Sequence, residues 1–159
     1  MPLIPTDASK NPSPRLKVVL RWLEALTDTH DVNALASLLT DDYTHSNVPR
    51  SIGFPPYFDR ASFLAHAEKT LIYVLHEYKY SVLEVVETED RVVVHAYADI
   101  VTSTGHAFES EIMILAHVVS QPDGEYKIRY WKEFLDTKMM ADDYYPELKR
   151  MEEVAKQSA

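Results

Sequence analysis

The N-terminal part of the chain shows the apolar spacing of an amphipathic helix. Large apolar side chains recur there every three or four positions, at Leu16, Val19, Leu20, Leu23 and Leu26. Ser13 and Pro14 stand immediately before this run. Serine is a favoured helix cap and proline a favoured first helical residue, so the pattern predicts a helix that begins at residue 14.

The next segments predict two shorter helices with a strand between them. Asp31 is placed to cap one helix, and Asp59 is placed to cap the other. Between them, residues 43–48 are predicted to form a short strand, and a loop with a Pro-Pro pair follows over residues 49–56.

From residue 78 onward the apolar pattern has a period of two, which indicates β-strands. The predicted strands are 78–87, 91–102, 107–119 and 125–136, and the segments between them have the composition of hairpin turns. Helices followed by an antiparallel meander predict an α+β fold. The tail, residues 145–157, is predicted to form a charged helix.

The length of 159 residues is typical of one domain with a sizeable core. We predict a loose N-terminal arm over residues 1–13, because this segment is rich in proline and poor in large apolar side chains. The folded domain is expected over residues 14–140, and a C-terminal tail over residues 141–159.

The charge and composition restrict the partners and the location of the protein. A formal net charge of −9 argues against nucleic acid and against anionic membranes as partners. The chain has no cysteine, no apolar run long enough to span a membrane and no secretory signal. We therefore expect a cytoplasmic protein without disulfides.

The last predicted strand contains the most informative candidate residue. Strict alternation places Arg129, Trp131, Glu133 and Leu135 on one face of this strand. A carboxylate among apolar walls has a raised pKa and can act as an acid or a base. Glu133 is thus the first candidate for chemistry, and the alternative is a structural carboxylate paired with Arg129 or a nearby lysine.

Four sequence strings, together with the order of elements, resemble the SnoaL-like branch of the nuclear-transport-factor-like superfamily. They are residues 41–49 (DDYTHSNVP), 92–95 (VVVH), 105–111 (GHAFESE) and 132–136 (KEFLD). Within that branch the chain looks most like the fungal subgroup of secondary metabolism. The resemblance covers roughly residues 15–140 and implies a cone in which three N-terminal helices pack on a curved antiparallel sheet.

Comparison with the enzymes of this superfamily is partly negative. Trp22 stands where ketosteroid isomerases have a tyrosine donor, and Asn47 stands nearest to their general base. Ala96 and Ala98 replace the Arg-Asp pair of the limonene-epoxide-hydrolase type, of which only the acid on the last strand is kept, as Glu133.

Further residues are candidates for catalysis or binding around Glu133. Glu111 shares the parity of Met113 and Leu115, and we expect it to face inward as a second carboxylate, unless it is an exposed strand end. His45 is a candidate proton shuttle or, alternatively, a structural histidine. Asn47 is placed to bind a carbonyl oxygen.

The walls of the predicted cavity come from aromatic and small residues, with one acid at its edge. The residues expected to contact substrate are Trp22, Tyr43, Trp131, Ala96, Ala98 and Asp136, although Asp136 can instead cap a turn. The stripe formed by His95, Tyr97 and Asp99 has the opposite phase on its strand. We therefore expect this stripe to face outward, toward solvent or a second subunit.

Two functions from different classes fit these residues. The first is a cofactor-free acid/base enzyme, of the isomerase, cyclase or dehydratase type, that acts on a hydrophobic natural-product intermediate. The alternative is a non-catalytic module that binds a small ligand or a protein. We expect no metal site, because the histidines show no metal-ligand spacing. We also expect a homodimer through the outer face of the sheet.

Overall fold

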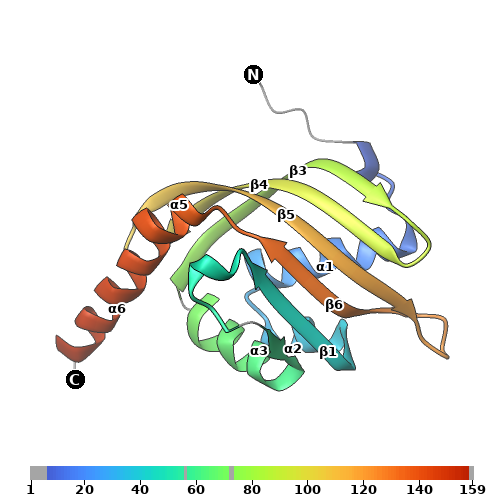
Figure 1. Ribbon diagram of the computed structural model, residues 1–159, viewed down its shortest axis with the longest axis horizontal. Helices are drawn as coiled ribbons and strands as arrows, with labels where there is room; N and C mark the ends of the chain where they lie inside the picture. Colours follow the sequence, from blue (N-terminus) through green and yellow to red (C-terminus); the bar gives the residue numbers. More distant parts are fainter. Residues whose placement is uncertain (1–6, 56, 72–73, 158–159) are drawn as a thin grey trace.

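The structure, a computed structural model, describes residues 7–55, 57–71 and 74–157 of the chain. Helices α1, α2 and α3 lie against one face of a curved sheet (Figure 1). The helical segments are η1 (Asp7–Ser9), α1 (Pro14–Thr27), α2 (Val32–Ser37), η2 (Arg50–Ile52), α3 (Arg60–His66), η3 (Ala67–Leu71), α5 (Thr137–Met139), η4 (Met140–Tyr144) and α6 (Tyr145–Gln157). The strands are β1 (Leu39–Val48), β2 (Phe58–Asp59), β3 (Leu75–Glu87), β4 (Arg91–Thr102), β5 (Ala107–Ser120) and β6 (Tyr126–Phe134). This is the predicted α+β cone.

The six strands follow the order β2-β1-β6-β5-β4-β3. The predicted meander from β3 to β6 is confirmed and is antiparallel throughout. Strand β1, by contrast, pairs with β6 in parallel, so the sheet is mixed rather than wholly antiparallel. This pairing joins the beginning and the end of the domain and places Asn47 beside Glu133 in register.

Local sequence explains where the helices begin. The Ser13 hydroxyl accepts a hydrogen bond from the Leu16 amide at 3.0 Å, so α1 starts at Pro14 as predicted. The predicted caps Asp31 and Asp59 are also present, since each carboxylate accepts from backbone amides of the helix that follows it. Strand β1 begins at Leu39, immediately after Leu38, the C-cap of α2.

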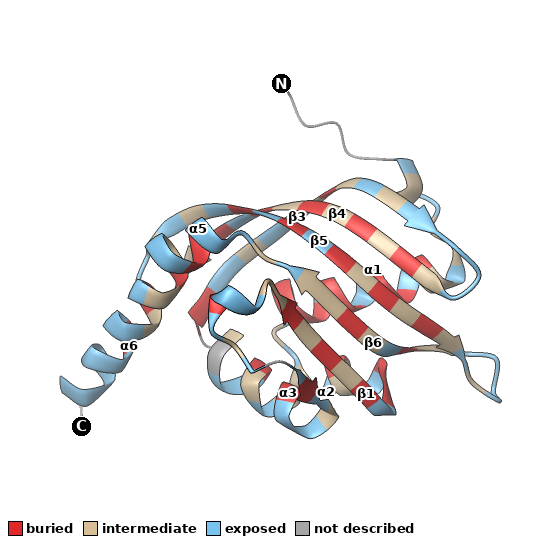
Figure 2. Ribbon diagram, in the orientation of Figure 1, coloured by how far each residue is buried: buried red, intermediate tan, exposed pale blue. Residues whose placement is uncertain are grey.

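The core lies between α1 and the inner face of the sheet. Burial alternates along β4, where Val92, Val94, Ala96 and Ala98 point inward and the residues between them are more exposed (Figure 2). His95, Tyr97 and Asp99 lie on the outer face, as predicted. No helix among the described residues is long and apolar enough to cross a membrane.

Strict alternation fails along β6. Ile128 and Trp131 are both fully buried, whereas Arg129 is exposed and pairs with Asp42 at 2.6 Å. The pairing of β5 with β6 shifts register between His117 and Val118, which marks an irregularity in the ladder. The prediction that Arg129 shares a face with Trp131 is therefore wrong.

The C-terminal segment packs against one end of the sheet. The predicted helix over residues 145–157 is confirmed as α6. Met139, Met140, Tyr144 and Met151 are buried in a second apolar cluster with residues of η2, β3 and β4. Packing thus continues across residue 140, and the boundary proposed there remains a prediction. Residues 1–6 of the predicted N-terminal arm lie outside the described residues.

Candidate active site

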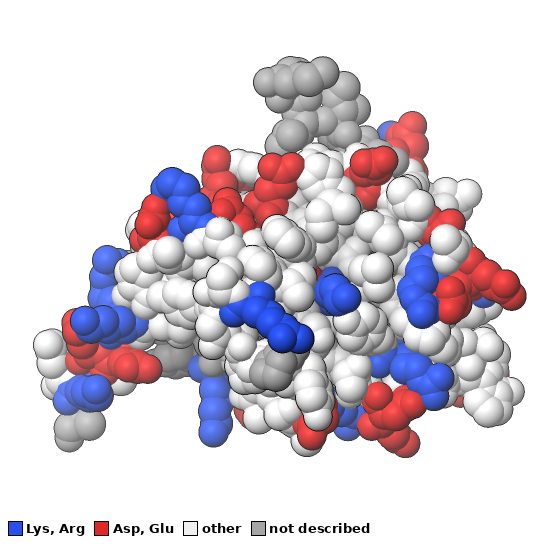
Figure 3. All heavy atoms as spheres, viewed as in Figure 1, with Lys and Arg blue, Asp and Glu red and all other residues white. Residues whose placement is uncertain are grey.

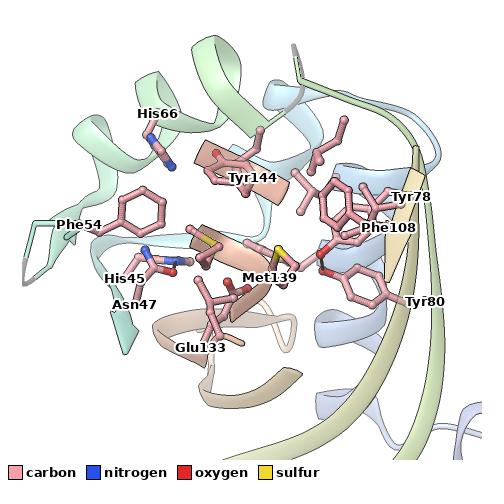
Figure 4. A pocket seen from close by; sticks show the side chains of 17 residues that line it. His45, Asn47, Phe54, His66, Tyr78, Tyr80, Phe108, Glu133, Met139 and Tyr144 are labelled. Carbon is pink, nitrogen blue, oxygen red and sulfur yellow. Dashed lines mark hydrogen bonds between the residues drawn. The ribbon is translucent and has the colours of Figure 1, made fainter. Parts of the chain in front are cut away.

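A small cavity lies between the helices, the inner face of the sheet and the C-terminal segment. Its volume is about 60 Å³, and its walls are mainly apolar. The wall includes the aromatic side chains of Trp22, Phe54, Tyr78, Tyr80, Phe108 and Tyr144. All of these except Trp22 are labelled in Figure 4. Small-molecule sites commonly measure roughly 300–1,000 Å³, so a large ligand requires wall side chains to move.

Glu133 reaches the cavity from β6, and it is the one carboxylate among the described residues of the wall. Its Oε1 accepts a hydrogen bond from the indole Nε1 of Trp131 at 2.7 Å. Burial raises the pKa of Glu133 to about 7, and the bond from Trp131 opposes that shift. Near neutral pH the group therefore exists in both protonation states, as a general acid or base requires.

His45 and Asn47 approach the same cavity from β1. His45 is buried, and burial lowers its pKa to about 3, so the imidazole is neutral at pH values near 7. Its Nδ1 lies 2.9 Å from the Tyr43 hydroxyl, and its Nε2 lies 3.3 Å from Oδ1 of Asn47. We assign the tautomer protonated on Nε2, because this atom then donates to Asn47 and Nδ1 accepts from Tyr43.

The chain from Tyr43 through His45 to Asn47 orients polar groups rather than moving protons. A histidine with so low a pKa is a poor proton acceptor at neutral pH, which does not support a proton shuttle at His45. Its bond fixes Oδ1 of Asn47 and leaves the amide nitrogen of Asn47 available to a ligand. Tyr43 is buried behind the wall and acts through His45.

Two stacked tryptophans support Glu133 from behind. The rings of Trp22 and Trp131 lie 4.0 Å apart between centroids, at 25° to one another. Trp22 faces the cavity, whereas Trp131 is completely buried and contributes its indole N–H to Glu133. The stack restricts the Trp131 ring and thus the direction of that hydrogen bond.

A pair of tyrosines from β3 forms the opposite wall. The Tyr80 hydroxyl donates to the Tyr78 hydroxyl at 2.6 Å, which leaves the hydroxyl hydrogen of Tyr78 free to bind a ligand oxygen. Burial and the nearby negative charge of Glu133 raise the pKa of both tyrosines, so both remain protonated donors. This pair is not among the residues predicted from the sequence, although two tyrosines two positions apart on one strand are a visible signal.

Glu111 does not reach the cavity. Its side chain is 60% exposed on the outer face and pairs with Nε2 of His95 at 2.6 Å. The expectation that it faces inward is wrong, because Met113, which shares its parity, is also exposed. The residues that β5 turns inward are instead Ser110, Ile112 and Ile114. Glu133 therefore has no second carboxylate beside it among the described residues.

Three other predicted contact residues lie outside the wall. Ala96 and Ala98 are fully buried on the inner face, but Tyr78 and Tyr80 of the adjacent strand β3 form the wall there. The Asp136 carboxylate caps α5, where Oδ1 accepts from the amides of Lys138 and Met139 at 2.8 and 3.2 Å. Asp136 thus positions Met139, which lines the cavity.

The site offers acid/base chemistry with oriented hydrogen-bond donors. Among the described residues, no group of three or more histidine, aspartate or glutamate side chains is placed to hold a metal ion. The described wall also contains no lysine or arginine. Its ionisable groups are Glu133, two histidines and three tyrosines, which suit proton transfer on an uncharged molecule.

Comparison with known proteins gives the family context. The model of the SnoaL-like domain matches residues 19–135. Among curated proteins, no significant match to the sequence was found.

Solved structures share the fold at low sequence identity. AusH from Aspergillus nidulans is 20% identical, with a TM-score of 0.67 over 84% of this chain and 87% of that protein. The BvnE pinacolase from Penicillium brevicompactum is 19% identical, with a TM-score of 0.68 over 87% of this chain and 96% of the enzyme. PrhC from Penicillium brasilianum is 16% identical, with a TM-score of 0.67 over 88% and 93% of the two chains.

Proposed function

The chain belongs to the SnoaL-like domain family, and we propose on that premise that it is an acid/base enzyme acting on a hydrophobic small molecule. The observation that supports this most is Glu133, whose pKa is raised to about 7 inside an aromatic cavity. A carboxylate with this pKa can accept a proton and return it at neutral pH. The described wall residues supply this chemistry with their own side chains.

The geometry suggests a division of roles. As a carboxylate, Glu133 takes a proton from a carbon next to a ligand carbonyl, and the electrons of that C–H bond move toward the carbonyl oxygen. Hydroxyl groups of the wall, such as that of Tyr78, donate hydrogen bonds to that oxygen. Protonated Glu133 then returns the proton to another carbon, which is isomerisation, or to a leaving hydroxyl, which is dehydration. In a cyclisation, the carbon that lost the proton attacks a second carbonyl carbon of the same ligand, and protonated Glu133 gives its proton to the oxygen of that second carbonyl.

The experiment uses a probe that does not depend on knowing the substrate. β-Tetralone is a small apolar ketone with acidic C–H bonds, and NMR follows exchange of its α-hydrogens with deuterium oxide. We expect the protein to accelerate this exchange and Glu133→Gln to abolish the acceleration, because the amide keeps the shape and loses the base. Equal exchange in both proteins would remove Glu133 from the mechanism.

A ligand-binding module without catalysis is the second candidate. The chain lacks the tyrosine and the base of the ketosteroid isomerases at Trp22 and Asn47, and its cavity is small. Saturable binding of β-tetralone without accelerated exchange would favour this candidate. One of the matching structures is a pinacolase, an enzyme, and this supports catalysis as the first proposal.

We also propose that the chain is a cytoplasmic homodimer that associates through the outer face of the sheet. Met113 and Phe134 are paired neighbours on β5 and β6, and they are 44% and 55% exposed. Figure 3 shows uncharged surface on the visible face, interrupted near its middle by Lys or Arg side chains. Analytical ultracentrifugation of Phe134→Glu should show monomers where the native chain forms dimers. A native chain that is monomeric at tens of micromolar would refute the dimer.

A further inference from the structure

Two hydrogen-bond donors in the cavity wall have no partner among the described residues. They are the indole Nε1 of Trp22 and the hydroxyl of Tyr144, and both atoms are buried. Their side chains are 1% and 5% exposed. Among the described residues, the other unpartnered buried atoms belong to Arg15, His30, Arg60 and Ser110, none of which lines the cavity.

An unpaired buried donor destabilises the free protein, because it has lost its hydrogen bonds to water. A ligand that supplies an acceptor restores the hydrogen bond that the donor lost on burial. Both residues line one cavity and come from different parts of the chain, Trp22 from α1 and Tyr144 from η4. Figure 4 shows the Tyr144 ring among the side chains of the wall.

The position of Tyr144 is fixed by several contacts of the C-terminal segment. These contacts reach the end of β4 and the turn that follows it. Glu147 is 1% exposed and accepts hydrogen bonds from the hydroxyls of Thr102, at 2.6 Å, and Thr104. Nε2 of His106 lies 2.9 Å from Oδ1 of Asp143. These contacts flank Tyr144 on both sides in the sequence, so its orientation toward the cavity is a property of the fold.

Tyr145 provides an internal comparison. Its hydroxyl donates to the carbonyl of Ile52, so its hydrogen-bonding capacity is used within the protein. Tyr144 is the adjacent residue and is more deeply buried, yet its hydroxyl has no such partner among the described residues. The two adjacent tyrosines therefore differ in whether the described part of the protein satisfies the hydroxyl group.

The charge of the wall restricts the ligand further. No lysine or arginine is among the described residues of the wall, and its only carboxylate is Glu133. A ligand carboxylate or phosphate would enter without a counter-ion and beside a negative group, which is unfavourable. A neutral apolar molecule with a carbonyl or hydroxyl oxygen matches the unpaired donors.

We propose that Tyr144 is a ligand-anchoring residue contributed by the C-terminal segment, and that it works with Trp22 to bind an oxygen of a neutral, otherwise apolar ligand. This inference rests on the proposed function only in placing the ligand in the same cavity. It does not require that Glu133 transfers a proton.

The test compares two probes that differ by one carbonyl oxygen, β-tetralone and tetralin. Trp22 and Trp131 are the two tryptophans of the chain and both belong to the site, so tryptophan emission reports occupancy. We expect the native protein to prefer β-tetralone. Tyr144→Phe should weaken the binding of β-tetralone by about fivefold or more and leave the binding of tetralin unchanged, because only the ketone accepts a hydrogen bond.

Thermal unfolding without ligand separates the two tyrosines. Tyr144→Phe should raise the unfolding temperature by roughly 2–4 °C, because it removes an unpaired buried hydroxyl. Tyr145→Phe should lower the unfolding temperature and leave the preference for the ketone intact. The inference is overturned if the native protein shows no preference for β-tetralone, or if Tyr144→Phe weakens the binding of both probes equally.

The same measurements keep this inference apart from the proposed function. Glu133→Gln should abolish hydrogen exchange and retain the preference for β-tetralone over tetralin. If the native protein does not accelerate exchange but still prefers β-tetralone over tetralin, catalysis is refuted and the role of Tyr144 stands.

Discussion

Glu133 and Glu111 lie on neighbouring strands of one sheet and face opposite sides of it. Glu133 borders an aromatic cavity and receives a hydrogen bond from a neutral indole, so burial raises its pKa to about 7. Glu111 is exposed on the outer face and pairs with His95. The comparison shows that the side of the sheet decides whether a carboxylate on these strands borders the cavity or the solvent.

The largest effect expected from this comparison concerns catalysis. Glu133→Gln should lower the rate of β-tetralone exchange by roughly 10²–10⁴-fold, the range for a positioned acid or base. Glu111→Gln is the matched control and should leave the rate unchanged, because its side chain points away from the cavity. A comparable loss in both variants would mean that the two carboxylates act together after all.

The second prediction concerns stability as a function of pH. The pKa of Glu133 is about 7 in the folded chain, compared with an ordinary value of 4.5. Between these two pH values the carboxyl group is ionised in the unfolded chain and still protonated in the folded chain. The stability of the native chain therefore decreases as pH rises and reaches its lower limit above the folded pKa. Glu133→Gln has no ionisable group at this position, so its stability does not show this decrease.

Chemical denaturation at a series of pH values measures this difference. The stability of Glu133→Gln relative to the native chain should increase from about pH 4.5 to pH 7 and then level off, with a total change on the order of 3 kcal/mol. A difference that does not vary with pH would show that the native carboxyl group has an ordinary pKa.

The third prediction concerns the hydrogen bond between Trp131 and Glu133. This bond lowers the pKa of Glu133 and opposes the effect of burial. Trp131→Phe should therefore move the midpoint of the pH–rate profile upward by about one to two pH units. Trp22→Phe keeps an aromatic ring in the stack and keeps the Trp131 indole as donor to Glu133, so the midpoint should stay in place. A shift in both variants would assign the effect to packing.

Elements specified by nearby residues could be predicted from the sequence. The start of α1 at Pro14, the strands of the meander and the whole of α6 follow from caps and from local apolar periods. Glu133 could be identified as a candidate because it follows Trp131 on the last strand. These predictions needed no knowledge of contacts between distant segments.

Features that depend on distant contacts could not be predicted. The parallel pairing of β1 with β6 and the irregularity between His117 and Val118 leave no mark in the local pattern. That irregularity changes which residues of β6 face inward, and parity counting alone also placed Glu111 on the wrong side. Tyr144 enters the cavity because the C-terminal segment docks on the sheet, and its sequence spacing contains no signal of that docking.

The smallest expected effect belongs to the outer face. Glu111→Gln should change the free energy of unfolding of the monomer by less than about 1 kcal/mol, because exposed ion pairs contribute little. The effect should decrease further as salt screens the pair. Chemical denaturation of Phe134→Glu chains with and without the Glu111 change measures this in a monomeric background. The side chains of His95 and Glu111 are 27% and 60% exposed. A loss of several kcal/mol would mean that both are far less exposed to water than these values indicate. The contrast with Glu133 would then no longer rest on burial.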